Sequence, residues 1–197
     1  KSEDVNPVCD IECRDEGMLN GLKDYIDGQN GKDVLVVMHT MGSHGPAYYK
    51  RYPSPFEVFS PACQTNQLNE CSNEEINNAY DNTIVYVDYV LSRLINLFKK
   101  YPAGKEIAII YISDHGESLG ESGIYLHGMP YLIAPIEQKQ VAALMWFNEE
   151  LLELLDINII SEKIDLPLSH DNLFHTLLGI MNIKTALYQD KMDIIAQ

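Results

Sequence analysis

An aspartate and a histidine at the end of an apolar run are the residues of this sequence best suited to bind a metal ion. Asp114 and His115 follow residues 107–112 after one serine. A carboxylate beside an imidazole suits zinc, although two ligands do not complete a tetrahedral site. Adjacent side chains on a straight strand point to opposite faces, so both reach one ion only if the backbone turns, and Gly116 permits a turn. The alternative is that Asp114 and His115 bind no metal and instead form hydrogen bonds with each other or with a helix terminus.

Three more histidines lie at a strand end or beside glycines. His39 ends the apolar run 34–38, His44 lies between two glycines in GSHG, and His127 precedes a glycine in YLHG. If the two apolar runs are neighbouring parallel strands, His39 and His44 share an edge with Asp114. A single histidine is more often a structural hydrogen-bonding residue, but this clustering favours metal or phosphate chemistry.

Two other histidines favour a structural interpretation. His170 and His175 lie in SHDNLFHTLLG, which predicts a helix over residues 171–178 capped by Ser169 or His170. On that helix, His175 is expected either to be exposed on the protein surface or to be packed in the protein core.

The elements that must position these residues follow a strand, helix, strand order. Ser72 and Glu75 form a capping box for a helix over residues 72–100, whose apolar side chains recur every three or four positions. Apolar runs at 34–38 and 107–112 flank it and predict a parallel pair in a doubly wound α/β sheet.

Other segments give weaker signals. We expect a short helix over 18–27, a long functional loop over 40–71 and a third strand over 141–147, whereas 151–160 is ambiguous.

Composition limits the range of functions. The chain has 197 residues, a length that predicts one domain. Its 14 basic and 29 acidic residues give a net charge of −15, so nucleic acid, itself a polyanion, is a poor partner. No apolar run approaches the roughly 18–20 residues that span a bilayer. The acidic start is unlike a signal peptide and begins with Lys1, so we expect a longer protein upstream.

The four cysteines form two close pairs in polar stretches. Cys9 lies four residues before Cys13, and Cys63 lies eight residues before Cys71. We expect two local disulfides, because free cysteines usually lie in apolar surroundings and neither pair has zinc-knuckle spacing. Free thiols and a zinc site are the alternatives. Disulfides would place the chain in the periplasm or another oxidising compartment.

Three motifs together resemble the phosphoethanolamine transferases of bacterial inner membranes. They are GSHGPAYYKRYP, YDNTIVYVD and YISDHGESLGESGIYLHGMPYLIAP, and the likeness runs from about Val34 to the end of the chain. DHG alone would indicate a resemblance only to the wider alkaline phosphatase and sulfatase superfamily, whereas the run through LHGMPYLIAP is specific to the phosphoethanolamine transferases. That family modifies lipid A and includes polymyxin-resistance enzymes.

The resemblance implies an alkaline-phosphatase-like α/β/α sandwich with a mostly parallel sheet, and zinc as cofactor. Asp114 and His115 match the zinc ligands of the family, while His44 and His127 match catalytic histidines beside the transferred phosphoryl group, which bind it or a second zinc and assist proton transfer. It also implies a periplasmic catalytic domain at the inner membrane. Phosphoethanolamine would pass from phosphatidylethanolamine to lipid A or a core sugar through a covalent threonine intermediate.

The resemblance also implies missing parts. The nucleophilic threonine and a glutamate zinc ligand of the family precede its matching motifs, and no threonine here fits. Several membrane helices precede them in the family and are expected to anchor the whole protein in the membrane. We therefore expect residues 1–197 to be the carboxyl-terminal portion of one catalytic domain, truncated at its amino-terminal side. By itself it should be inactive, bind zinc weakly and be able to dimerise through a sheet edge. A phosphoglycerol transferase, a sulfatase-like hydrolase and a non-catalytic metal-binding fragment are the alternatives.

Overall fold

The computed structural model describes residue 9, residues 12–164 and residues 166–196. It divides into two compact units: residues 1–97 with 115–141, and residues 98–114 with 142–197. Residues 1–8, 10–11, 165 and 197 lie outside the described part.

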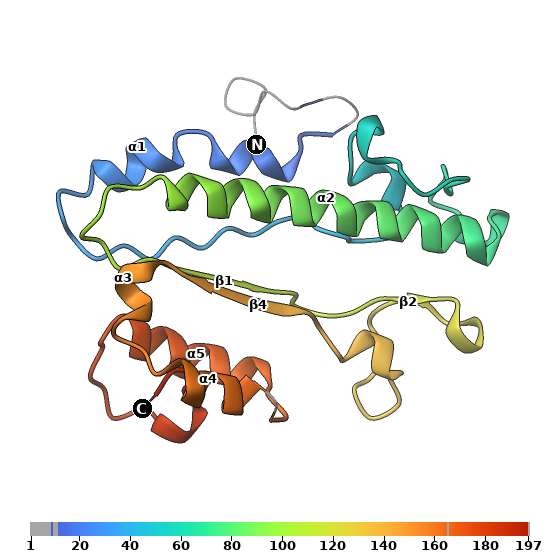
Figure 1. The fold of residues 1–197 in the computed structure, drawn as a ribbon. Coiled ribbons are helices and arrows are strands. Elements are labelled where there is room, and N and C mark those ends of the chain that lie inside the picture. Colours follow the sequence, from blue (N-terminus) through green and yellow to red (C-terminus); the bar gives the residue numbers. More distant parts are fainter. Residues whose placement is uncertain (1–8, 10–11, 165, 197) are drawn as a thin grey trace. The chain divides into compact units, whose positions relative to one another are not determined.

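The long helix α2 dominates the first unit. It spans Asn73–Lys99, confirming the helix predicted over 72–100 (Figure 1). The predicted capping box is present, since Ser72 N donates to Glu75 Oε2 at 2.7 Å and Glu75 N donates to Ser72 Oγ at 3.2 Å. Its buried face consists of Ile76, Ala79, Asn82, Thr83, Tyr86 and Val90.

The loop over residues 40–71 packs on this helix. Tyr48, Cys63 and Leu68 form one core cluster with Ile76 and Ala79 of α2. Short 3-10 helices at Tyr48–Lys50, Ser54–Phe56 and Leu68–Glu70 shape it.

Both predicted disulfides are confirmed. Cys63 bonds to Cys71, and Cys9 bonds to Cys13.

Two smaller features complete the first unit. The predicted short helix over 18–27 is a 3-10 turn, Asp15–Leu19, followed by α1, Leu22–Asp27. Strands β2 (Ser118–Leu119) and β3 (Tyr125–Leu126) form an antiparallel hairpin.

The second unit combines a strand pair with three helices. Strand β1 (Ala108–Ile112) pairs antiparallel with β4 (Ala143–Phe147), so both predicted strands are present. The ambiguous 151–160 region holds the end of α3 (Glu149–Leu152) and the start of α4 (Ile157–Ile164). A core cluster of Phe147, Leu151, Ile160 and Ile195 joins the strands to the helices.

Helix α5 spans His170–Ile180, and Ser169 is its cap, as predicted. The Ser169 side chain accepts a hydrogen bond from Asp171 N, and Asn172 completes a capping box.

The prediction of a strand at 34–38 is wrong. These residues form no strand, and Leu35 and Val37 are 56% and 81% exposed. The hydrogen-bonded partner of β1 is the antiparallel β4, so the expected parallel crossover pair does not describe this strand. An extended segment becomes a strand only beside a hydrogen-bonded neighbour, and within the described residues 34–38 belong to no sheet.

No helix among the described residues is both long enough and apolar enough to cross a bilayer.

Candidate metal centre

The β2–β3 hairpin brings a glutamate and a histidine together. Ser118 of β2 pairs antiparallel with Leu126 of β3, so Glu117, one position before Ser118, and His127, one position after Leu126, lie opposite each other. Glu117 Oε1 accepts a hydrogen bond from His127 Nδ1 at 2.9 Å. Side chains two positions apart on an extended chain share a face, which places His115 on the same side as Glu117.

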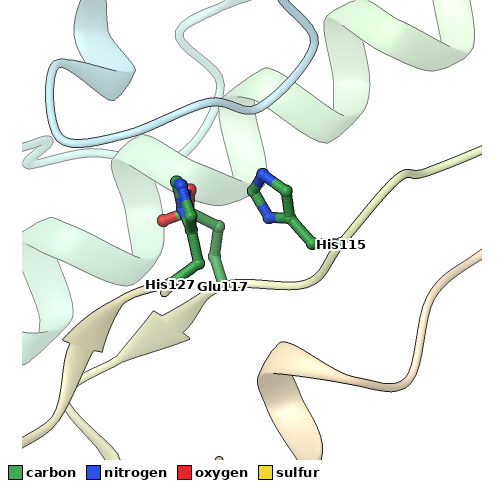
Figure 2. A group of neighbouring side chains, drawn as sticks. All are labelled: His115, Glu117 and His127. Atoms are coloured by element: carbon green, nitrogen blue, oxygen red, sulfur yellow. Dashed lines mark hydrogen bonds and ion pairs between the residues drawn. The ribbon is translucent and has the colours of Figure 1, made fainter. Parts of the chain in front are cut away.

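These three side chains form a compact group that could hold a metal ion. One ligand atom each from His115, Glu117 and His127 lies within 4.8 Å of the others, and Figure 2 shows all three turned toward one another. The ring centroids of His115 and His127 are 3.9 Å apart. Two imidazoles and a carboxylate, with a further position open, form the donor set of many catalytic zinc sites.

Gly116 allows the chain to approach its neighbour closely between His115 and Glu117. Its N–H donates to Gln138 O at 3.1 Å, and a Cβ at this position would lie 1.9 Å from the backbone oxygen of Glu137. No residue with a side chain fits without moving that backbone. The glycine therefore serves packing here.

The carboxylate of Glu117 is buried and hydrogen-bonded on both oxygens. Oε2 accepts from the Tyr48 hydroxyl at 2.6 Å, and Oε1 also accepts from Gly45 N at 3.3 Å. Burial, and then the hydrogen bond to Glu117, raise the pKa of Tyr48 above its ordinary value. Tyr48 therefore stays protonated and donates at neutral pH, which stabilises a buried negative charge in the site.

Hydrogen bonds at Nδ1 determine which histidine nitrogen is available. His115 Nδ1 lies 3.0 Å from Gly116 O, and His44 Nδ1 lies 2.6 Å from Gly45 O. A carbonyl oxygen can only accept, so Nδ1 carries the proton in both rings. The Nδ1 of His127 likewise donates to the Glu117 carboxylate. In the neutral form, each ring then presents an unprotonated Nε2 to a metal ion or a proton.

His44 lies beside this group, as the clustering predicted. Its ring centroid is 5.2 Å from that of His127 and 6.2 Å from that of His115. The buried Asp15 holds the preceding turn by accepting from Met41 N at 3.1 Å and Gly42 N at 2.9 Å. Arg51 Nε donates to His44 O at 2.7 Å.

The remaining sequence-predicted residues take other places. Asp114 is exposed and belongs to the second unit, at its boundary with the first, whereas His39 is exposed in the first unit outside the three-residue group. His170 Nε2 donates to Ser113 O at 2.8 Å, and the buried His175 accepts from Gln189 N at 3.1 Å. Both have structural hydrogen bonds, in keeping with the interpretation favoured from the sequence.

Sequence reasoning missed Glu117. The signal was present in DHGE, since a glutamate two positions after a histidine shares its face on an extended chain. What the sequence did not provide was the hairpin register that sets Glu117 opposite His127.

Comparison with known proteins identifies the family. The sequence profile of the Sulfatase family matches residues 2–183, so the chain belongs to that family. Its fold is accordingly the alkaline-phosphatase-like α/β fold predicted from the motifs.

The chain is similar to phosphoethanolamine transferases. It is 48% identical to phosphoethanolamine transferase EptA from Escherichia coli K12 over 93% of this chain and 34% of that protein. The chain thus spans about a third of the length of this curated relative.

Two solved structures are similar over most of the chain. The C-terminal periplasmic domain of phosphoethanolamine transferase EptC from Campylobacter jejuni has a TM-score of 0.82 at 48% identity, covering 91% of this chain and 57% of that one. The integral membrane protein lipooligosaccharide phosphoethanolamine transferase A from Neisseria meningitidis has a TM-score of 0.89 at 39% identity, covering 94% and 35%.

Proposed function

We propose that residues 1–197 are the carboxyl-terminal portion of a single periplasmic catalytic domain that transfers phosphoethanolamine with the help of zinc. The donor is phosphatidylethanolamine, the acceptor is lipid A or a core sugar, and the whole protein lies at the inner membrane. The likeness to EptA and to a periplasmic EptC domain supports this assignment.

The observation that carries the proposal is the group of His115, Glu117 and His127, with ligand atoms within 4.8 Å of one another. Its two imidazoles and one carboxylate fit zinc, and because Nδ1 of both histidines faces an oxygen acceptor, Nε2 is the nitrogen suited to bind it. When bound, zinc would stabilise charge on the phosphoryl oxygens and lower the pKa of the attacking hydroxyl.

The residues of the chain have distinct roles in this proposal. Asp114 and His115 are retained as zinc ligands from the resemblance, and Glu117 supplies negative charge and orients His127. His44 and His127 lie beside the phosphoryl group, His127 as a zinc ligand together with His115 and Glu117. The neutral His44 imidazole, whose Nδ1 holds its proton, presents Nε2 to accept one from an attacking hydroxyl.

The covalent step requires a threonine that no position of this chain matches. In the proposed sequence that threonine attacks phosphorus, diacylglycerol leaves, and the acceptor hydroxyl then takes the phosphoethanolamine from the threonine. The chain alone is therefore expected to be inactive, and the test must supply the preceding segments.

A chimera provides that test. This chain replaces the matching third of EptA from E. coli, and phosphoethanolamine on lipid A is measured by mass spectrometry, with headgroup-labelled phosphatidylethanolamine as donor. We expect transfer by the chimera, loss of transfer with His44→Ala or His127→Ala, and near-normal transfer with Glu74→Gln, a control at an exposed position outside the site. A folded chimera that hydrolyses sulfate esters or transfers phosphoglycerol instead would contradict the proposal, as would full activity of both histidine variants.

A further inference from the structure

We propose that the loop over residues 128–139 docks on the surface of a phospholipid bilayer through its apolar tip, Tyr131, Leu132 and Ile133. The loop belongs to the first unit and begins directly after His127. Figure 1 draws it, in the yellow-orange part of the colour scale, as a closed excursion that extends away from β2.

The apolar tip is unusually exposed for its composition. Tyr131, Leu132 and Ile133 are 78%, 94% and 66% exposed, and Ile136 in the same loop is 58% exposed. Single exposed apolar residues are ordinary on protein surfaces, but a contiguous group of large ones marks a contact site for another molecule or a membrane.

Internal hydrogen bonds hold the tip outward. Ile133 N and Ala134 N both donate to Pro130 O at 2.9 Å, which forms a tight turn behind the tip, and Ala134 is buried. The buried Gln138 fixes the base of the loop, because its Nε2 donates to Ser118 Oγ at 3.0 Å. The tip is therefore presented by an ordered turn and does not fold back into the core.

The loop has no net charge, so an anionic lipid surface would repel it less than it repels the rest of this acidic chain. Glu137 and Lys139 are its only charged residues and cancel each other, whereas the chain carries −15. Lys139 Nζ lies 5.2 Å from the centroid of the Tyr131 ring. At a membrane interface such a lysine can reach lipid phosphates while the tyrosine ring lies at headgroup depth.

The apolar tip is close in sequence to the metal centre, so a membrane contact at the tip would affect where that centre lies. Tyr131 is four residues after His127, so a tip inserted at headgroup depth would bring the site to the level of the lipid phosphates. This step rests on the proposed function, in which the donor is a membrane lipid. The membrane contact itself rests on the exposure, order and charge of the loop.

Vesicle flotation of the chain tests the inference. The probe is vesicles of phosphatidylethanolamine and phosphatidylglycerol, without metal or acceptor. We expect the chain to float with the vesicles, and Tyr131→Ser, Leu132→Ser and Ile133→Ser together to lower the partition coefficient at least about tenfold, equivalent to about 1.4 kcal/mol. Because the chain carries −15 and phosphatidylglycerol is anionic, added salt should screen their repulsion and should not weaken binding through the apolar tip.

A matched control removes exposed apolar surface elsewhere in the same unit. Val58 and Phe59 are 63% and 44% exposed, so Val58→Ser with Phe59→Ser should leave flotation unchanged. The substituted side chains of the tip are exposed, and an unchanged far-ultraviolet circular dichroism spectrum would verify that the fold is retained. Flotation of the triple variant equal to that of the unsubstituted chain would overturn the inference.

The test separates this inference from the proposed function. Flotation without transfer by the chimera would contradict the function and leave the membrane contact standing. An unsubstituted chain that fails to float would overturn the membrane contact, whatever the chimera does.

Discussion

Glu117 Oε1 lies 2.9 Å from His127 Nδ1 across the β2–β3 hairpin, so each residue fixes the other. The hydrogen bond sets the histidine tautomer, and the histidine offsets part of the cost of burying a carboxylate. A metal ligand and its orienting partner are thus provided by one short hairpin.

Tyr48→Phe tests how far the buried carboxylate depends on its neighbours. The substitution removes the hydroxyl that donates to Glu117 Oε2 at 2.6 Å. Because Glu117 is buried, we expect a loss of about 1–3 kcal/mol in the free energy of unfolding, measured with urea. Tyr49→Phe, which keeps the ring beneath the Lys50 ammonium, is the control and should change stability much less. Equal effects of the two variants would contradict this role of Tyr48.

Asn82→Ala should strongly destabilise the first unit. The Asn82 side chain is fully buried, accepts from Val58 N and Phe59 N, and donates to Phe59 O. Leaving two or more of these backbone groups unpaired should lower the free energy of unfolding by about 3 kcal/mol. Asn77→Ala, an exposed position on the same helix, should change it by under about 1 kcal/mol. Urea midpoints of the two variants provide the comparison.

The amino-terminal end of α2 should respond to acid. Hydrogen bonds from the Ser72 N–H and then from its hydroxyl lower the pKa of Glu75 below its ordinary value of 4.5. A carboxyl whose pKa is depressed by folding contributes stability above its unfolded pKa and loses it as pH falls through the folded value. Stability should therefore decline below about pH 4.5, and Glu75→Gln should reduce that part of the decline. Thermal melts at stepped pH, with Glu74→Gln as control, measure the difference.

Loss of the Cys63–Cys71 disulfide should destabilise the loop that packs on α2. Its sequence separation is 8, for which the loss of unfolded-chain entropy corresponds to about 2.5 kcal/mol. Replacing both cysteines with serine should produce a loss of that order in urea unfolding. The Cys9–Cys13 bond closes a shorter loop with a separation of 4, so its removal should cost less. The reverse order would contradict the loop-length argument.

Local signals carried most of the correct fold predictions. The helix over 72–100 has its own capping box and a long apolar stripe, and the strands near 107–112 and 141–147 are short apolar runs. Strand direction is different, because pairing depends on residues far apart in sequence. The run at 34–38 shows this clearly, since its composition is that of a buried strand yet Val37 is 81% exposed.

The candidate site shows the same division. Gly-flanked histidines identified His44 and His127, and the structure brings both beside His115. Glu117 was missed, since its role arises from a cross-strand register and from a tyrosine 69 positions earlier in the chain. The assignment of Asp114 as a zinc ligand rests on the motif and stays a prediction.

Calorimetric titration of the chain with zinc tests the central claim most directly, comparing the unsubstituted chain with Glu117→Gln, His127→Ala and the control Glu137→Gln. The account predicts that the Glu117 and His127 substitutions each weaken zinc binding at least about tenfold, with the control unchanged. Zinc affinity that is the same in all four proteins would contradict a metal centre built on His115, Glu117 and His127.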